Sequence, residues 1–423
     1  MRRYLSPFLS VFFVLLFMGF ASATNGDNLM AIGPIARSMG GVGVAAPQDA
    51  ISAVFANPAA MCFGPYCPGT EVNFGGTLFM PTVDATVTTS DGNVVSASSD
   101  KKVYAIPAIG LSVPITNSWR FGLAAYGVSG LGVDYRDTAF DTTPLPGSGG
   151  AYPLVQGAYT QLQIMKFSPS IAYQVNNNLS LGLGVHIDYA NLDLRNGSSF
   201  NYGIGAQLGA IYKASDMLTL GATYITPQEV DHQNVVGTPG GSRDLKLESP
   251  QQIGVGISVE PIRNALLVEV DGRWINWSSA TGYDDFDWKD QWVLALGVQY
   301  KPTKQLALRA GYNYANNPVN EHNNFVGFNG TPNPPTTFVQ GIPFPNYYYE
   351  TFRIIGFPAV AKQHVSFGIG YELSNKFALN AGYTHAFEQT ISESGTTPTS
   401  PTPVTLKSTL SEDSVEFGIT WRF

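Results

Sequence analysis

The sequence predicts an all-β protein, a 14-stranded antiparallel transmembrane β-barrel with an N-terminal hatch segment plugging its lumen. Three observations support this fold class. Apolar and polar residues alternate along many segments, and the connections between these segments are alternately short and long. The composition combines 45 Gly, 21 Tyr and 25 Phe with only 13% charged residues. Sparse charge with many aromatic side chains suits a barrel whose outer face contacts lipid.

The C-terminal segment, 411–423, shows the alternation most clearly. One set of positions is apolar or aromatic, and the positions between them are polar or small: Val415, Phe417, Ile419, Trp421 and Phe423 against Glu416, Gly418, Thr420 and Arg422. A two-residue period places the two sets on opposite faces of a strand. We expect this strand to close the barrel and to be recognised by the barrel-assembly machinery.

The same alternation, followed along the chain, predicts fourteen strands, an even number as in single-chain bacterial barrels. They are expected at 71–82, 101–114, 119–134, 158–175, 179–194, 199–213, 217–227, 246–259, 265–277, 289–301, 305–316, 361–373, 376–389 and 409–423. Short turns and longer loops separate them in alternation. The short turns are therefore expected in the periplasm and the long loops outside the cell.

The first 23 residues have the pattern of a secretory signal peptide. Arg2 and Arg3 precede an apolar run at 8–20, and Ala21-Ser22-Ala23 follows as a cleavage site. A membrane anchor is the alternative, but the run is short and lacks a basic flank after it. The net charge of −8 and the absence of basic runs argue against nucleic acid as a partner.

Residues 24–70 do not alternate and are predicted to form the hatch, with the barrel spanning 71–423. The segment is rich in Gly, Pro and Ala, which permits tight turns and close backbone approach. It is too apolar for a solvated tail and too short for a core of its own, so we place it inside the lumen. Cys62 and Cys67 are a possible local disulfide, since the compartment is oxidising.

Specific residues of this segment carry a resemblance to a known family. The run Ser38-Met39-Gly40-Gly41-Val42-Gly43-Val44-Ala45, with Asp49-Ala50 and Asn57-Pro58-Ala59, resembles the hatch of the FadL family. The similarity continues through 121–127, 306–314, 357–360 with His364, and 381–387. These are outer-membrane transporters for long-chain fatty acids and other hydrophobic compounds. The hatch residues that match are Gly40, Gly41, Asn57, Pro58 and Ala59.

The resemblance implies passive uptake by capture at the outer loops, hatch movement and lateral exit through the barrel wall. In the family the exit lies at a kink in the third strand, and the matching stretch here contains Tyr126, Gly127, Ser129 and Gly130. A glycine inside a strand often marks a bulge, although an ordinary Gly-rich strand remains the alternative. The ligand is expected to be a fatty acid, a hydrocarbon or an aromatic compound.

The outer loop 317–360 is unusually aromatic, and Phe344, Tyr348, Phe352 and Phe357 are its candidate ligand-capture residues. The alternative is that the loop folds over the barrel mouth as structural packing.

A carboxylate ligand would need a cation in the lumen, and the alternation points Arg273 and Arg309 inward. Glu269 and Asp271 share a face with Arg273, so we expect an ion-pair network in the wall.

Other functions find little support in the sequence. The five His residues occur without a hydrolase or metalloprotease motif, so no enzyme, cofactor or metal site is expected. The acidic loop Asp284, Asp285, Asp287 and Asp290 is interpreted as solvated. We expect a monomer in the outer membrane of a Gram-negative bacterium, in contact with lipid and lipopolysaccharide. A nonspecific polar porin and a non-transporting, adhesin-like barrel remain open alternatives.

Overall fold

The protein is described by a computed structural model that covers residues 24–62, 69–90, 92–146, 148, 150, 152–195, 197–238, 240–331 and 333–423. The predicted signal peptide and Cys67 lie outside the described residues. In the part described, no helix is long and apolar enough to cross a membrane.

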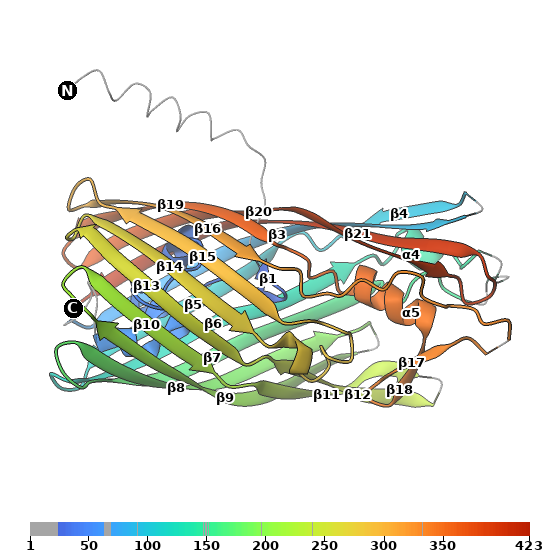
Figure 1. Cartoon of the computed structure of the whole chain (residues 1–423), viewed down its shortest axis with the longest axis horizontal. Helices are drawn as coiled ribbons and strands as arrows, with labels where there is room; N and C mark the ends of the chain where they lie inside the picture. Colours follow the sequence, from blue (N-terminus) through green and yellow to red (C-terminus); the bar gives the residue numbers. More distant parts are fainter. Residues whose placement is uncertain are drawn as a thin grey trace, which may run out of the picture.

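Fourteen long strands of the described chain form one closed antiparallel barrel (Figure 1), which confirms the predicted fold class. In order around the wall they are β3 (Glu71–Thr89), β5 (Tyr104–Pro114), β6 (Trp119–Asp134), β7 (Tyr159–Gln174), β8 (Leu179–Asp193), β9 (Ser198–Lys213), β10 (Leu218–Ile225), β13 (Gln252–Ile262), β14 (Leu266–Ile275), β15 (Gln291–Tyr300), β16 (Leu306–Ala315), β19 (Gln363–Ser374), β20 (Phe377–Thr396) and β21 (Pro403–Arg422). The last strand pairs with the first, from Val404 opposite Thr89 to Arg422 opposite Glu71. This pairing leaves the sheet without an edge.

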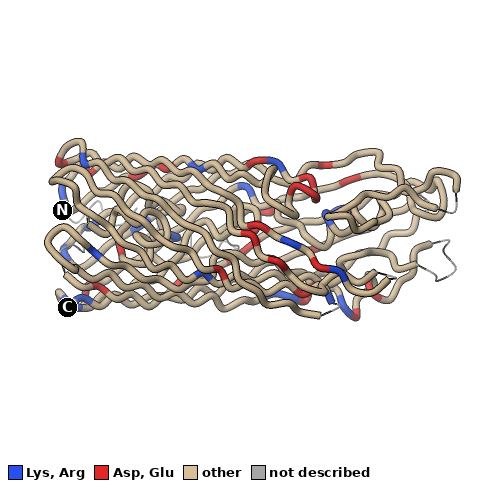
Figure 2. The backbone as a smooth tube through the Cα atoms, turned by 90° about the horizontal axis from the view of Figure 1, so that it is seen from below, with Lys and Arg blue, Asp and Glu red and all other residues tan. Residues whose placement is uncertain are grey.

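The strands expose apolar side chains outward and bury polar ones inside. Phe417 and Trp421 on β21 are 57% and 42% exposed, whereas Glu416 and Thr420 between them are buried. Trp292 on β15 is 66% exposed. Figure 2 shows charged residues gathered toward the loop end and at the turns, with long uncharged stretches of wall between them. The outer face of the wall is therefore suited to lipid, and its inner face to a polar lumen.

The two ends of the barrel differ. Short turns join the strands at the end where Phe423 lies, and the other end carries all the extra elements (Figure 1). These are β4 (Val94–Ser98), α4 (Ala139–Thr142), β11 (Gln228–Thr238), β12 (Gly241–Ser249), η3 (Trp277–Ser279), β17 (Thr336–Val339), β18 (Ile342–Pro345), α5 (Asn346–Thr351) and the π-helical turn η4 (Phe352–Gly356).

The first six residues of the predicted barrel strand 246–259 do not belong to the barrel. Residues up to Ser249 belong to β12, which pairs with β11 in a hairpin outside the barrel sheet, and the barrel strand β13 starts at Gln252. Pro250 lies at the break, and a proline has no N–H to donate to a strand ladder.

The hatch, which we define as residues 24–62, lies inside the barrel toward the turn end (Figure 1). It consists of β1 (Thr24–Asn25), β2 (Asn28–Leu29), α2 (Pro34–Ser38), α3 (Ala50–Ala56) and the 3-10 turn η2 (Pro58–Cys62). Pro34 suits the first turn of α2, where no N–H is needed. Asp49 caps α3 by accepting a bond of 2.8 Å from Ser52 N. Almost every residue of the hatch is buried.

Candidate functional site

The inner wall of the barrel is shaped around the hatch backbone. Wall glycines lie where any side chain would overlap the hatch. A Cβ on Gly311 of β16 would lie 1.9 Å from Gly40 N, and one on Gly182 of β8 would lie 2.2 Å from Ala59 N. A Cβ on Gly221 of β10 would lie 2.0 Å from Val44 O. Since real atoms cannot approach so closely, these glycines allow a contact that any other residue would prevent.

Acidic side chains on β14 hold the hatch by its backbone N–H groups. Asp271 Oδ2 accepts bonds from Gly43 N at 2.8 Å and Val44 N at 3.0 Å. Glu269 Oε1 accepts from Ala45 N at 2.8 Å and Ala46 N at 3.0 Å. Hydrogen bonds from backbone N–H groups to a carboxylate are charge-assisted and strong. The two carboxylates therefore anchor the hatch.

The ion-pair network predicted around Arg273 was wrong. Arg273 does point inward, but none of the described carboxylates lies within ion-pairing distance of it. Its Nη2 instead donates to Met30 O of the hatch at 2.8 Å. The sequence could not reveal this arrangement, because the partners are main-chain groups of a distant segment.

The five hatch residues predicted from the sequence all contact the wall or shape the hatch. Gly40 has a φ of +69° and donates from its N to Ser366 Oγ at 2.9 Å. Gly41 has a φ of +84°, a left-handed conformation that favours glycine. Asn57 Nδ2 donates to Val44 O, Ala210 O and Ala222 O at 2.7, 3.1 and 3.2 Å.

The remaining two residues begin η2. Pro58 follows Asn57 directly, and the carbonyl of Ala59 accepts a bond of 2.7 Å from Ser180 Oγ on β8. The motif thus marks where the hatch meets the wall strands β8 to β10.

A buried ion pair fastens the first helix of the hatch. Arg37 Nε lies 2.7 Å from Glu416 Oε1 of β21, and both side chains are fully buried. Arg37 also donates from Nη2 to Ser414 Oγ at 2.7 Å. The Arg37 side chain is thus bonded to two residues of the closing strand.

Strand β6 contains an irregularity at residues 126–130, the stretch predicted to form the lateral exit. The pairing of β6 with β7 shifts register between Gly127 and Ser129, so Val128 is an extra residue in the ladder. Pairing of β6 with β5 ends at Tyr126, opposite Ala108. Beyond that point β5 pairs with β3 but no longer with β6, and β6 pairs with β7 and, at Ser129, with β2 of the hatch. The hydrogen-bonded wall is therefore interrupted between β5 and β6.

The start of the hatch reaches this interruption. Asn28 of β2 pairs with Ser129, and Gly130 N donates to Asp27 O at 3.1 Å. Tyr126 is fully buried and packs edge-on against Phe55 of α3, with ring centroids 5.5 Å apart. The structure thus brings the predicted Tyr126, Gly127, Ser129 and Gly130 together with the first residues of the hatch.

A cavity of about 390 Å³ occupies the interruption. Most of its lining is apolar, including Leu29, Phe79, Ile106, Leu131, Ile164 and Leu410. Leu29 belongs to the hatch and is buried, whereas the lining residues Ala105 and Pro107 of β5 are exposed. Lys101 and Glu412 are the charged residues of the lining, and Glu412 accepts a bond of 2.8 Å from Thr24 Oγ1. The cavity size is in the range of small-molecule sites.

The aromatic loop 317–360 folds over the loop end of the barrel. Of the four predicted capture residues, Tyr348 and Phe357 are buried, and the Tyr348 hydroxyl donates to Pro153 O at 2.9 Å. Phe344 and Phe352 are half-buried and line a small cavity of about 50 Å³ between this loop and the β11–β12 hairpin. Tyr348 and Phe357 belong to the buried core of the loop, and Phe344 and Phe352 pack against that core as partly buried residues. A role of these four residues in ligand capture stays a prediction.

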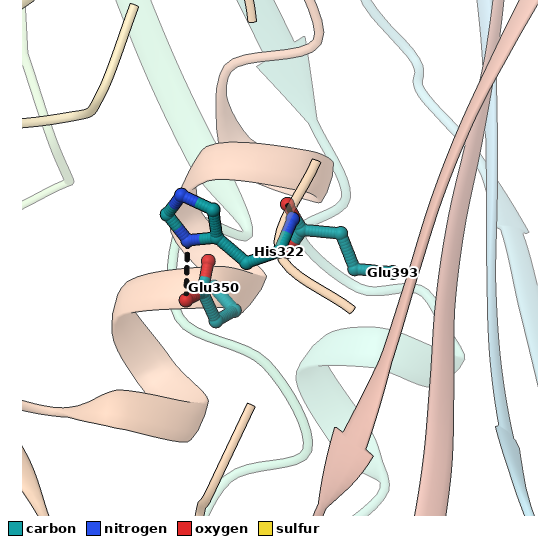
Figure 3. A group of neighbouring side chains, drawn as sticks. All are labelled: His322, Glu350 and Glu393. Atoms are coloured by element: carbon teal, nitrogen blue, oxygen red, sulfur yellow. Dashed lines mark hydrogen bonds and ion pairs between the residues drawn. The ribbon is translucent and has the colours of Figure 1, made fainter. Parts of the chain in front are cut away.

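A cluster of ionisable side chains holds this loop in place. His322 Nδ1 lies 2.9 Å from Glu350 Oε1 of α5, the contact drawn in Figure 3, and Glu393 of β20 lies beside them. Arg353 Nη1 lies 2.5 Å from Glu350 Oε2 and 2.9 Å from Glu393 Oε1. The guanidinium therefore supplies the positive charge between the carboxylates, and the cluster needs no metal ion.

The stability of the loop should depend on pH through His322. Its hydrogen bond to Glu350 raises the pKa of His322 above the ordinary value of about 6.5, against the opposing effect of burial, and Asp287 raises it further. Because the pKa of His322 is higher in the folded state, the stabilisation that His322 gives the loop is complete below its pKa in the unfolded chain. This stabilisation is lost as the pH rises through its pKa in the folded protein.

Limited proteolysis of the loop in the wild type and the His322→Gln variant, from about pH 5.5 to about pH 8.5, measures this dependence. The variant should be cleaved faster at low pH, and the two rates should converge as the pH rises. A ratio of rates that does not change with pH would contradict the prediction.

The disulfide prediction stays a prediction. Cys62 is half-buried at the end of η2, with its Sγ 3.8 Å from Ser118 O, and Cys67 lies outside the described residues.

Comparison with known proteins decides the family. Residues 17–200 and 190–327 match the family model described as "Outer membrane protein transport protein (OMPP1/FadL/TodX)". The chain belongs to this family. The predicted resemblance to FadL is thereby confirmed, and with it an outer-membrane location in a Gram-negative bacterium. No curated protein matches the chain.

Solved structures of FadL-like proteins share the fold at low sequence identity. The P. putida toluene transporter TodX aligns with a TM-score of 0.63 and 16% identity, over 93% of this chain and 99% of the other. A Pseudomonas aeruginosa FadL homologue gives 0.64 and 17%, over 96% and 100%. The Ralstonia pickettii toluene transporter TbuX gives 0.60 and 18%, over 93% and 99%. These likenesses establish the barrel fold across nearly the whole chain.

Proposed function

We propose that the protein is a passive channel through which hydrophobic compounds, long-chain fatty acids or monoaromatic hydrocarbons, cross the polar layer of the outer membrane. The observation that carries this proposal is the apolar cavity at the interruption between β5 and β6. Its lining joins the buried hatch residue Leu29 to Ala105 and Pro107, which lie on the exposed face of β5. A ligand that enters the lumen would therefore leave sideways into the bilayer.

The free energy for such transfer comes from the ligand itself. Each CH₂ group gains about 0.8 kcal/mol on leaving water, so a continuous apolar path needs no further energy source. Phe344 and Phe352 would take the ligand at the loop end, and the hatch must shift before it reaches the exit. No chemical step is required of the protein, and we propose that it is not an enzyme.

The relatives suggest the class of ligand. TodX and TbuX are described as toluene transporters, and the P. aeruginosa protein as a FadL homologue. In this chain Lys101 lines the cavity and could pair with a fatty-acid carboxylate, whereas the apolar remainder suits either class. A polar porin is disfavoured, because the hatch fills the lumen. We further propose a monomer that contacts lipid and lipopolysaccharide and is assembled through its C-terminal strand.

Uptake by whole cells tests this function. Cells carrying the gene, and matched cells lacking it, are supplied with labelled oleate or labelled toluene at equal concentration. We expect the gene to accelerate entry of at least one of the two, with no effect on a polar solute such as labelled sucrose. Equal uptake of both hydrophobic compounds in the two strains would refute the proposal. Faster entry of sucrose would favour a porin.

A further inference from the structure

A cavity of about 140 Å³ lies on the turn side of the hatch. Its lining is polar, unlike that of the apolar exit cavity. Two hatch residues, Ile35 and Gln48, form part of its lining. The β15–β16 turn and the turn-side ends of β15, β16, β19, β20 and β21 form the rest. Its charged lining residues are mostly cationic: Lys301, Lys304, Arg309 and Arg422 against Glu372. Short turns mark this end as the periplasmic one, so the cavity faces the periplasm.

Arg309 is a buried cation of this cavity without an acidic partner. It is 8% exposed, and its Nε and Nη1 donate to Gln299 Oε1 at 2.7 Å and to Asn380 Oδ1 at 3.0 Å. Both acceptors are neutral amides, and no described carboxylate lies within ion-pairing distance of the guanidinium. A buried charge is costly unless an opposite charge compensates it. Arg309 is therefore held in place but not neutralised.

Lys301 adds a second positive charge near the first, and none of the described carboxylates forms an ion pair with it. Its ammonium makes no hydrogen bond or ion pair with a described side chain. Burial followed by the positive charge of Arg309 lowers the pKa of Lys301, against the opposing effect of the Glu372 and Glu260 carboxylates. The nearby carboxylates are engaged elsewhere. Glu372 lies 2.9 Å from Arg422, and Asp49 accepts the bond from Ser52 that caps α3. Two adjacent like charges destabilise each other unless an anion sits between them.

We propose that this cavity is a binding site for a small oxyanion, a carboxylate or phosphate group, held between the Arg309 guanidinium and the Lys301 ammonium. The guanidinium is already fixed by Gln299 and Asn380, and its Nη2 is left to donate to the anion. Charge-assisted hydrogen bonds of this kind are about twice as strong as neutral ones. The volume exceeds by several-fold the space that one water needs, so the site is roomy enough for the group.

The site also touches the hatch. Gln299, which accepts from Arg309, donates from its Nε2 to Gln48 Oε1 of the hatch at 2.9 Å. One amide thus connects the anion-binding arginine with the segment that fills the lumen. The anion is either free in the periplasm or the head group of a lipid that the barrel contains, and both sources present the same chemistry.

Isothermal titration calorimetry on the full-length barrel in detergent, at low ionic strength, tests the site with inorganic phosphate, acetate and decanoate as probes. We expect saturable binding that Lys301→Gln weakens by about tenfold or more, since one of two charge-assisted contacts is lost. Lys102→Gln, the same change at an exposed lysine outside the cavity, should bind as the wild type does. The Arg309→Gln variant should show no binding, provided that it folds. If it does not fold, the affinity of the Lys301→Gln variant alone tests the proposal.

The three probes separate the two sources. Decanoate binding more tightly than acetate and displacing phosphate would identify a lipid head group. Phosphate binding with decanoate no better than acetate would identify a free anion. Identical isotherms for Lys301→Gln and the wild type, or no binding of any probe, would overturn the proposal.

Discussion

Replacing Arg37 by Met should raise the fraction of time that the barrel conducts ions by about two orders of magnitude or more. Arg37 and Glu416 form a fully buried ion pair at 2.7 Å. Removing one partner of such a pair costs about 3–5 kcal/mol, because the other charge stays buried and unpaired. That cost falls on the seated hatch, so the unseated and conducting state gains population. Single-channel recording in planar bilayers measures the change.

Two control variants isolate the buried charge. The double variant Arg37→Met with Glu416→Leu removes both charges and should restore most of the closed time, since no unpaired carboxylate remains. Lys246→Met breaks the exposed pair with Glu229, whose side chains are 48% and 40% exposed, and should leave conductance unchanged. If the single Arg37 variant conducts no more than the wild type, this pair does not secure the hatch.

Replacing Gly127 by Phe should reduce uptake of the hydrophobic ligand by about tenfold or more while leaving the barrel folded. A Cβ at this position would lie 2.6 Å from Ile106 Cγ2, the branch methyl of a side chain that lines the exit cavity. Ile106 must shift to make room, which costs about 1–3 kcal/mol, and the added ring then fills the cavity. Initial rates of uptake by whole cells, with the amount of folded barrel measured in parallel, give the answer.

Gly76 supplies the matched control for this prediction. It lies on β3 between the exposed Phe74 and Leu78, and no atom lies within 4 Å of where its Cβ would stand. Gly76→Phe therefore adds the same ring to the lipid-facing surface, where an apolar side chain is accepted. This variant should transport normally. Normal transport by the Gly127→Phe variant would show that the ligand does not pass through the exit cavity.

The wall of the barrel was predictable because a strand facing lipid on one side and a lumen on the other repeats every two residues. Rows such as Trp292, Leu294 and Leu296 are exposed as that period requires. The β11–β12 hairpin was not separated from the barrel, since an exposed hairpin beyond the membrane has the same period as a wall strand. Only Pro250 signalled the break.

The site was predictable where backbone conformation demands a particular residue. Gly40 and Gly41 have positive φ, and Gly127 lies next to a bulge. Because such conformations favour glycine, the residue type itself indicated the structural role. The anchors of the hatch were not predictable. Asp271 binds backbone N–H groups, and a charged side chain in an alternating strand looks the same whether its partner is a side chain, a main chain or water.

A reversible cross-link across the exit tests the central claim, that ligands leave through the wall between β5 and β6. The Cβ of a residue at 127 would lie 3.8 Å from Ile106 Cβ, which is the usual separation in a disulfide of about 3.8 Å. Ile106→Cys with Gly127→Cys, in a chain whose Cys62 and Cys67 are changed to Ser, can therefore be joined and released in the same molecule. The measurement is ligand uptake by whole cells before and after reduction. Lateral exit predicts slow uptake while the bond is intact and recovery on reduction; equal rates in the two states would contradict it.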